Sequence, residues 1–396
     1  MKAYLFPLLA AAAVALPLLT PAAYAATKKD KTSLKSESAT PFERAVDVFV
    51  AGKGNPYKSI RIPDIVKAGN ILVAFAEGRY ENTDQGRNDL ISSVSKDGGK
   101  SWGPVEVVAR ADGATFNNPC VIYDEESKQM VLFFQRYPKG VKERDQNIPT
   151  GWQDDRCIRN FVSISKNGKK WSTPKDVTKT TKNEGVTITC SGPNPGCRLT
   201  RGPHKGRLIV PLNEGPFGNW TVAVAYSDDH GKTWHIGQKS AAGGGVNEVS
   251  VAETEEGGLI VVSRAWGGNQ RKVLYSEDGG ETWGETKAHD QLPSPNCQNG
   301  LLRYSFADDE KLAKRGRLLF SSPSTGQRTN GIIKMSYDDG KTWEVEKPVG
   351  DGSFAYSTLC TVKPGIVGLL FESSGKIRFT TFTISWLTDG RDEGKK

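Results

Sequence analysis

Short runs of alternating apolar and polar residues recur along the chain, and each run leads into a turn of similar composition. The runs cover residues 90–94, 161–164, 222–226, 273–275 and 332–335. Alternation with a period of two is typical of β-strands with one buried face. Each run therefore predicts a strand that ends directly in a turn.

The turns share the phrase Ser-x-Asp-x-Gly-x-Ser/Thr-Trp. It begins at Ser95, Ser227, Ser276 and Ser336, and a copy shortened by one residue begins at Ser165. The Asp can accept hydrogen bonds from nearby backbone N–H groups, and the Gly permits a positive φ. Successive copies begin 70, 62, 49 and 60 residues apart, which indicates a repeat with variable loops. Hairpin units of this length cannot bury their own apolar faces, so the pattern predicts blades around an axis.

The two ends of the chain differ in composition from the middle. Residues 1–25 predict a cleaved signal peptide, because Lys2 precedes an apolar run and Ala23-Tyr24-Ala25 fits a cleavage site. Residues 26–44 read as a mobile polar leader, 45–388 as one propeller domain and 389–396 as a polar tail. No later run approaches the roughly 20 apolar residues of a membrane span. We therefore expect a secreted or periplasmic protein without stable membrane insertion.

Composition narrows the function classes further. The formal charge of +8 fits an acidic substrate as well as ordinary solubility. No Lys/Arg blocks interleaved with aromatic residues are present, so nucleic-acid binding is not expected. The four histidines lack metal-ligand spacing, and the chain has neither a phosphate loop nor a Gly-x-Ser-x-Gly motif. We expect no metal and no cofactor.

Six cysteines stand in a chain that we expect to be exported, where disulfides can persist. Cys190 and Cys197 flank a turn-forming Ser-Gly-Pro-Asn-Pro-Gly loop, and we predict a disulfide between them. The other four cysteines could be buried thiols.

Charged and aromatic residues of unusual context stand outside the repeated turns. Each alone has an ordinary interpretation, such as a surface charge, a turn-capping Asp or a packing Tyr. They are Arg61 in Ile-Arg-Ile-Pro, Arg79 and Asp84 in 75–89, Asn247-Glu248 sixteen residues before Ser263-Arg264, Arg328, Tyr356 twenty-eight residues later, and Glu372. In this order, and together with the five turns, they resemble the exo-α-sialidases (neuraminidases), glycoside hydrolases whose turns are called Asp-boxes or BNR repeats. The resemblance covers nearly all of 46–386.

The resemblance implies a fold and a set of roles. The fold is an all-β, six-bladed β-propeller of four-stranded antiparallel blades with Asp-box turns. Arg61, Arg264 and Arg328 would hold the substrate carboxylate, and Glu372 would pair with Arg61. Tyr356 would be the nucleophile and Glu248 its general base. Asp84, or alternatively Asp89, would be the acid/base, Arg79 would contact the sugar ring, and Asn118 stands where we expect an acid that recognises ring substituents.

These residue types suit the carboxylate that sialic acid carries on its reacting carbon. Guanidinium groups bind a carboxylate through fixed pairs of donors. A carboxylate nucleophile at about 4 Å would be repelled by roughly 4 kcal/mol at an effective dielectric near 20. A neutral tyrosine avoids this repulsion, and two displacements at one carbon retain its configuration.

The sequence thus predicts a secreted retaining exo-α-sialidase, without cofactor and as a monomer, that acts on sialylated oligosaccharides, glycoproteins and glycolipids. Its substrate could carry N-acetylneuraminic acid or a related acid such as the deaminated form. A trans-sialidase or intramolecular trans-sialidase would use the same residues. A non-catalytic Asp-box propeller that binds glycans is the second alternative, but it should lack the set Asp84, Glu248 and Tyr356.

Overall fold

The computed structural model describes residues 1, 39–324 and 326–395. The predicted signal peptide after Met1 and residues 26–38 of the predicted leader lie outside this part of the chain. The described residues from 40 onward form one compact unit. Within its described residues the unit is built from strands, with three short helices: α2 (Thr178–Thr181), η1 (Glu310–Leu312) and α3 (Ile384–Leu387). None of the helices that the structure describes has the length and apolar character of a membrane span.

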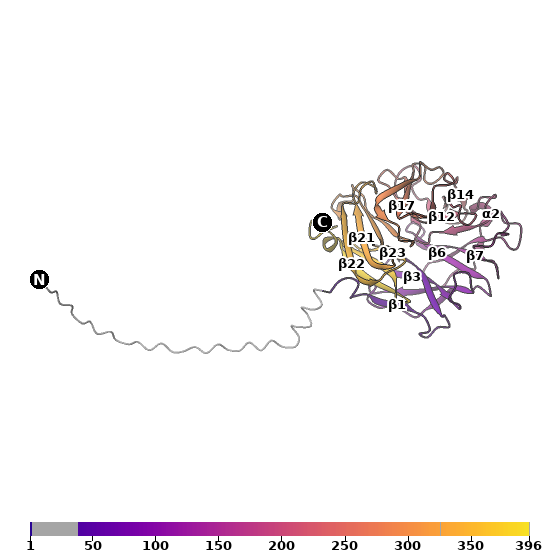
Figure 1. Ribbon diagram of the computed structural model, residues 1–396, viewed down its shortest axis with the longest axis horizontal. Coiled ribbons are helices and arrows are strands. Elements are labelled where there is room, and N and C mark those ends of the chain that lie inside the picture. The colour runs from indigo at the N-terminus through magenta and orange to yellow at the C-terminus, as the bar shows by residue number, and fades with distance from the viewer. Residues whose placement is uncertain (2–38, 325, 396) are drawn as a thin grey trace. The chain divides into compact units, whose positions relative to one another are not determined.

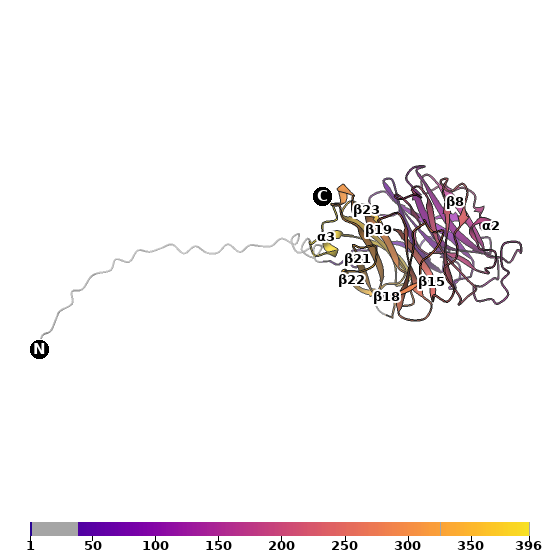
Figure 2. The same cartoon turned by 90° about the horizontal axis from the view of Figure 1, so that it is seen from above.

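Three sheets contain four antiparallel strands each. The first consists of β15 (Val246–Glu253), β16 (Leu259–Ala265), β17 (Gln270–Ser276) and β18 (Lys287–Pro293). The second consists of β19 (Gly300–Ser305), β20 (Arg317–Pro323), β21 (Thr329–Ser336) and β22 (Val345–Ser353). The third consists of β23 (Ser357–Lys363), β24 (Ile366–Ser373), β25 (Lys376–Thr383) and β1 (Val46–Val50). Helix α3 lies beside β22 (Figure 2).

The remaining strands form two larger sheets. A five-stranded sheet contains β10 (Thr189–Ser191), β11 (Cys197–Arg198), β12 (Leu208–Glu214), β13 (Thr221–Ser227) and β14 (His235–Ile236). An eight-stranded sheet contains two successive groups of four antiparallel strands. They are β2 (Ser59–Ala68), β3 (Ile71–Arg79), β4 (Asn88–Ser95) and β5 (Glu106–Ala109), then β6 (Thr115–Asp124), β7 (Gln129–Tyr137), β8 (Arg159–Ser165) and β9 (Lys175–Asp176).

The hydrogen bonding therefore gives five sheets where six separate four-stranded sheets were predicted. The difference arises at one point, because β4 and β6 meet through a single parallel pair, Asn88 and Thr115. That pair joins two groups of four strands into the eight-stranded sheet.

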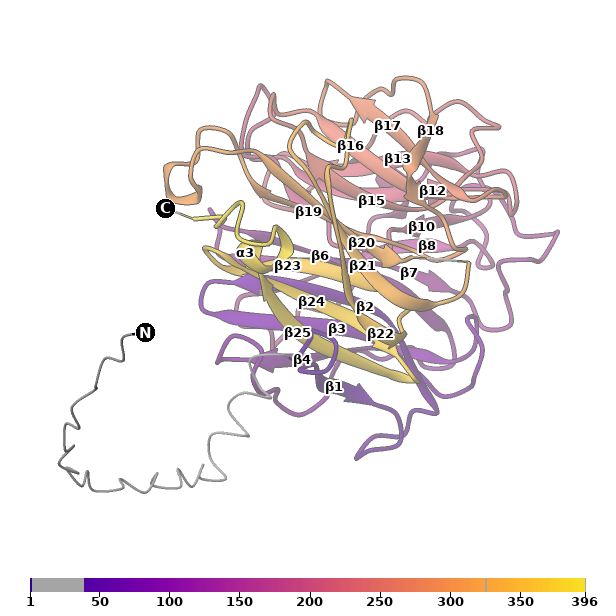
Figure 3. The same ribbon diagram turned by 60° about the vertical axis from the view of Figure 1, so that its left-hand side comes forward.

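The inner strands of the sheets contact one another in a closed ring. Strand β2 contacts β6, β6 contacts β10, β10 pairs with β12, β12 contacts β15, β15 contacts β19, β19 contacts β23, and β23 contacts β2. Figure 1 shows β6 and β23 near the middle of the domain and β14 and β22 toward its outside. Strand β1 pairs with β25, so the beginning of the domain completes the last sheet (Figure 3). This arrangement confirms the predicted all-β propeller with four-stranded antiparallel blades.

The five repeated turns lie between the third and fourth strands of their groups. In the turn after β13, Ser227 donates a hydrogen bond of 2.9 Å to Asp229, and Asp229 accepts one of 2.9 Å from the backbone N–H of Thr233. Gly231 has a φ of +82° and donates its N–H to Ser227. These bonds connect residues at most four positions apart, so each turn is built from its own phrase.

The hydrophobic core lies between neighbouring sheets. One cluster joins Val131 and Phe133 of β7 to Val210 and Leu212 of β12, with Trp234 of the next turn packed against them. Other clusters have the same composition, with side chains from two adjacent sheets. Each sheet is therefore stabilised mainly by its neighbours in the ring.

The predicted disulfide is wrong. Cys190 of β10 pairs with Asn213 of β12, whereas Cys197 of β11 pairs with Ile209 of the same strand. Four positions along a strand separate the two cysteines by about 13 Å, and a disulfide requires Cα atoms within about 7 Å. All six cysteines lie in the described part of the chain and are free thiols. The Cys190 thiol instead shares a hydrogen bond of 3.0 Å with the Tyr137 hydroxyl.

The predicted polar tail packs against the domain as far as residue 395. Asp392 is buried and accepts two hydrogen bonds, of 2.7 and 2.6 Å, from the buried Arg317 guanidinium. The ion pair between Asp392 and Arg317 therefore holds this polar segment against the domain.

Candidate active site

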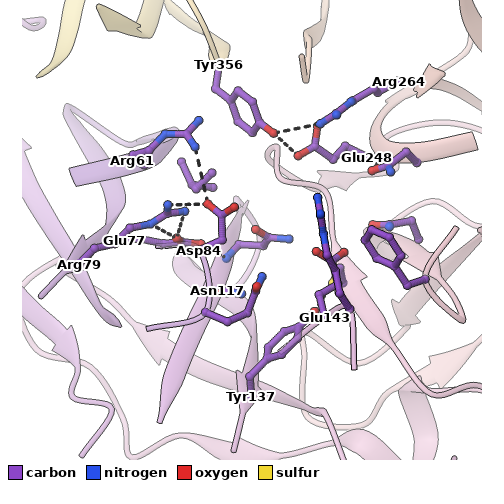
Figure 4. A pocket seen from close by; sticks show the side chains of 18 of the residues that line it. Arg61, Glu77, Arg79, Asp84, Asn117, Tyr137, Glu143, Glu248, Arg264 and Tyr356 are labelled. Atoms are coloured by element: carbon purple, nitrogen blue, oxygen red, sulfur yellow. Dashed lines mark hydrogen bonds and ion pairs between the residues drawn. The ribbon is translucent and has the colours of Figure 1, made fainter. Parts of the chain in front are cut away.

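A cavity of about 230 Å³ opens among the inner strands of several sheets. Figure 4 shows Tyr356 and Arg264 on one side of it, Arg61, Arg79 and Asp84 on a second, and Tyr137 and Glu143 on a third. Its lining includes eight of the nine predicted catalytic and substrate-binding residues: Arg61, Arg79, Asp84, Asn118, Glu248, Arg264, Arg328 and Tyr356. The ninth, Glu372, lies outside this lining and contacts Arg61. The ring thus brings together residues that are almost 300 positions apart.

β-Bulges shape the ends of the inner strands at this cavity. The register shifts between Arg61 and Asp64 in β2, between Asn117 and Cys120 in β6, and between Val246 and Val249 in β15. A bulge bends a strand and redirects its side chains, and bulges are common beside active sites. Ile62 has a φ of +61°, a costly conformation for a β-branched residue. The three shifts coincide with the positions of Arg61, Asn118 and Glu248.

Tyr356 and Glu248 form a hydrogen-bonded pair at the cavity wall. The Tyr356 hydroxyl donates to Glu248 Oε1, and Arg264 Nη1 donates to Glu248 Oε2 at 3.0 Å and to the Tyr356 hydroxyl at 3.4 Å. Burial raises the pKa of the Tyr356 phenol well above its ordinary value, and the Glu248 carboxylate raises it further. The free phenol therefore stays protonated while it donates its hydrogen bond to Glu248.

The predicted arginines surround the Tyr356 ring. The guanidinium groups of Arg61 and Arg328 lie 5.0 and 5.2 Å from the ring centre. Arg61 is held by Glu372, with contacts of 3.2 Å from Nε and 2.9 Å from Nη2, and Glu372 also accepts the N–H of Ile62 at 2.8 Å. Guanidinium groups therefore converge beside the tyrosine, where their N–H donors can bind an anionic ligand.

Asp84 lies at the edge of the cavity with its side chain 65% exposed. Arg79 donates to it at 2.7 Å, and Arg61 lies 3.8 Å away. Burial alone would raise the pKa of the Asp84 carboxyl, but the Arg79 and Arg61 guanidiniums together hold it below its ordinary value. Arg79 is in turn bound by the buried Glu77, whose other oxygen accepts the N–H of Asn118 at 2.8 Å.

The alternative acid, Asp89, lies outside the cavity. It is fully buried and accepts hydrogen bonds from the hydroxyls of Tyr57 and Tyr80, at 3.1 and 3.0 Å, and from the backbone of Ala111 at 3.0 Å. These contacts fix the loop that carries Asp84. Asp84 is therefore the aspartate that the fold presents to a ligand.

Several lining residues were not predicted: Glu77, Asn117, Tyr137, Glu143, Arg144, Asn213, Phe217 and Trp266. Glu77 stands in the same Ala-Glu-Gly-Arg phrase as Arg79, so this phrase points to both residues. Tyr137 ends an apolar strand and reads as a packing residue. Glu143 belongs to a polar loop, residues 138–158, in which no single residue stands out. Burial, followed by the nearby Glu248 and Asp84 carboxylates, raises the pKa of Glu143 to about 7.

Within the described residues, no group of three or more His, Cys, Asp or Glu side chains has the arrangement of a metal site. The polar groups of the cavity are instead guanidiniums, carboxyls, amides and phenols. The arrangement can bind an organic anion and transfer protons from Tyr356 to Glu248 and through Asp84.

An Asp-box propeller whose central cavity joins three arginines to a tyrosine–glutamate pair defines a class of glycoside hydrolases. Comparison with known proteins places the chain within that class. Residues 69–369 match the family model described as a BNR repeat-like domain. The chain belongs to the exo-α-sialidase family of Asp-box glycoside hydrolases.

Three relatives illustrate the similarity. The chain is 30% identical over 359 residues to a sialidase of Micromonospora viridifaciens, and the match covers 88% of this chain but only 55% of that protein. It is 26% identical to the Hadza microbial sialidase Hz136, with a TM-score of 0.79 over 87% of this chain and 69% of that one. The intramolecular trans-sialidase from Ruminococcus gnavus shares the fold, with a TM-score of 0.75 at 20% identity over 86% of this chain and 98% of that one.

Proposed function

We propose that the protein is a retaining exo-α-sialidase that removes terminal sialic acids from glycoconjugates through a tyrosyl intermediate. The observation that carries the proposal is the hydrogen-bonded Tyr356–Glu248 pair beside the guanidiniums of Arg61, Arg264 and Arg328. Sialidases are the tyrosine-dependent exception among retaining glycosidases. We also propose that the domain has six blades, counting the eight-stranded sheet as two at its Asn88–Thr115 pair.

In the first step the arginines hold the substrate carboxylate, and the Tyr356 oxygen attacks the anomeric carbon. The phenol proton passes to Glu248 as the carbon–oxygen bond to Tyr356 forms. The bond to the glycosidic oxygen breaks, and Asp84 gives its proton to that oxygen. Glu248 must act in concert with the attack, because burial keeps the free phenol protonated.

In the second step water attacks the same carbon from the side that the leaving group vacated. Asp84 accepts the water proton, the bond to Tyr356 breaks, and Glu248 returns its proton to the phenolic oxygen. Two inversions at one carbon give α-sialic acid as the first product.

Asp84 needs a proton for the first step, although the free protein favours its ionised form. A bound substrate carboxylate would neutralise much of the positive charge of Arg61 and Arg328, and the pKa of Asp84 would then rise. The proposal therefore implies that cleavage is faster at acidic pH.

The test is release of 4-methylumbelliferone from its α-sialosides, N-acetylated and deaminated, by wild type, Tyr356→Phe and Tyr123→Phe. We expect at least a thousandfold loss in Tyr356→Phe, because the nucleophile is removed, and wild-type rates in Tyr123→Phe, whose phenol lies outside the cavity lining. Proton NMR of the wild-type reaction should show α-sialic acid first. Initial β-product, or full activity in Tyr356→Phe, would contradict the tyrosyl mechanism.

The same NMR experiment separates hydrolysis from transfer. A trans-sialidase would place the sugar on another hydroxyl, so a new sialoside or an internal anhydro product would replace free sialic acid. We propose hydrolysis as the main reaction and, from the composition of residues 1–25, action outside the cytoplasm.

A further inference from the structure

Residues 294–299, between β18 and β19, contact Arg264, Arg328 and the backbone directly after Tyr356. We call this stretch the 294–299 segment. It contains no repeated motif, and Asn296 is its one exposed residue. Its contacts with the neighbouring strands are hydrogen bonds from side chains and from its own backbone carbonyls.

Asn296 connects two of the three arginines. Its side-chain oxygen accepts from Arg264 Nη2, and its backbone carbonyl accepts from Arg328 Nη2 at 3.1 Å. Asn296 has a φ of +53°, a left-handed conformation that asparagine tolerates better than most residues. Two like-charged guanidiniums repel each other, so an uncharged residue that binds both can set their separation without cancelling the charge that attracts an anion.

Other residues of the segment hold the backbone beside the reacting groups. Gln298 donates to the carbonyl of Ser357 at 2.8 Å and accepts the Ser357 N–H at 3.0 Å, which fixes the backbone directly after Tyr356. Ser294 accepts the N–H of Ala265, the residue after Arg264, at 3.0 Å. The side chain of Cys297 packs in one buried cluster with Tyr356.

Arg271 of β17 anchors the segment from beneath. It is fully buried, and its guanidinium donates to the carbonyls of Pro293 at 3.0 Å and Gln298 at 3.5 Å, and to the Ser322 hydroxyl at 2.9 Å. All three acceptors are uncharged. A buried charge destabilises a fold unless it is paired or hydrogen-bonded. Two of the Arg271 hydrogen bonds hold the carbonyl directly before the segment and the carbonyl of Gln298 near its end.

We propose that the 294–299 segment positions the carboxylate-binding arginines, with Asn296 as the positioning residue that spaces Arg264 and Arg328 and Arg271 as its buried anchor. The inference rests on the proposed function, since the anion that these arginines bind is the carboxylate of the sugar acid. Asn296 acts through the arginines, because it holds the guanidinium groups of Arg264 and Arg328 in the geometry that binding of one carboxylate requires.

The test uses Asn296→Gly, because glycine keeps the left-handed backbone and the carbonyl that binds Arg328 and removes only the contact with Arg264. The matched control is Lys128→Gly. Lys128 has nearly the same φ, +54°, and lies exposed in the hairpin at the far end of β6 and β7 from Asn117. Calorimetry then measures the affinity for 2,3-didehydro-2-deoxy-sialic acid and for its methyl ester, which has the same ring but no carboxylate charge.

We expect wild type and Lys128→Gly to prefer the acid over the ester by the same factor. In Asn296→Gly this factor should be about tenfold smaller, which corresponds to the loss of one charge-assisted hydrogen bond. Ester binding should stay unchanged, which a general loss of structure would not allow. Arg271→Met should shift the preference in the same direction, and Arg271→Lys less. An unchanged acid-to-ester ratio in Asn296→Gly overturns the proposal. Wild type that neither cleaves a sialoside nor binds the acid would instead contradict the proposed function.

Discussion

Burial and neighbouring charges shift the pKa values of the ionisable side chains of the cavity in opposite directions. Burial raises the pKa of the Tyr356 phenol and raises that of Glu143 to about 7, whereas the Arg79 and Arg61 guanidiniums lower the pKa of Asp84. Separated pKa values assign separate roles to groups in one site. A phenol that stays protonated, a carboxylate that receives its proton and an exposed acid at the edge are the combination that a tyrosine nucleophile needs.

Glu143 predicts a pH effect on substrate binding. Because its pKa is raised to about 7, it is neutral below that pH and becomes a carboxylate as the pH rises through it. The added charge repels an anionic substrate by about 1 kcal/mol at about 8 Å and an effective dielectric near 40, so KM for a sialoside should rise roughly three- to fourfold between pH 6 and 8. In Glu143→Gln the steady-state KM should stay level over this range. A parallel rise in wild type and variant would show that Glu143 is not the titrating group.

At the scale of elements, the inner strands present the predicted site residues at their irregular ends. The shifts in β2, β6 and β15 stand where Arg61, Asn118 and Glu248 enter the cavity, while the regular parts of the same strands pack in the core. The repeated turns lie at another place in each group of strands, between its outer strands, and their glycines face the preceding group of strands in the ring. Gly280, for example, lies against Val224 of β13. The turns therefore stack the blades and leave the cavity to the inner strands.

Gly280→Ala should destabilise the domain. Gly280 has a φ of +93°, and an added Cβ would lie 2.3 Å from a methyl group of Val224. The backbone conformation and the overpacking together should lower the free energy of unfolding by about 2–4 kcal/mol, measured by urea denaturation with tryptophan fluorescence. Gly284→Ala is the control from the same turn, since its φ is not positive and its new Cβ would approach only a carbonyl at 3.6 Å. Equal stability of the two variants would show that the turn does not stack the blades.

At the scale of the whole molecule, the ring is closed by residues from its two ends. Strand β1 completes the sheet of β23–β25, and Arg61 of the first inner strand pairs with Glu372 of the last sheet, 311 positions away. The cavity is lined by residues from both halves of the ring, so we expect it to depend on this closure. Stability and catalysis should therefore depend on the same contacts.

Phe49→Ala tests this closure. Phe49 of β1 is fully buried in a cluster that joins residues of β2–β4 to Leu370, Ile377 and Phe379 of the last sheet. Removing the ring should cost about 3–5 kcal/mol of unfolding free energy, and sialoside cleavage should disappear at the same urea concentration as the native tryptophan fluorescence. Val107→Ala, at an exposed position, should change the unfolding free energy by less than about 0.5 kcal/mol. If Phe49→Ala still cleaves the sialoside at urea concentrations above its fluorescence transition, the site does not depend on closure of the ring.

The sequence by itself determined the turns, the propeller and the family of the protein. An Asp-box turn is made by hydrogen bonds between residues at most four apart, so its phrase contains all that its structure requires. The order of Arg61, Glu248, Arg264, Arg328 and Tyr356 carried the resemblance, and the fold brings these residues to one cavity. Their chemical roles stay predictions until the variants are measured.

Only the tertiary structure decided which further residues join that cavity and which predicted contacts fail. Glu143 and Asn296 stand in polar stretches without periodicity, and their neighbours lie on other strands and loops. Cys190 and Cys197 are close in sequence, but their pairing with different residues of β12 holds them apart. The single Asn88–Thr115 pair merged two predicted sheets into one. In each case the deciding contact is made between strands or around the ring, where no local stretch of sequence contains both partners.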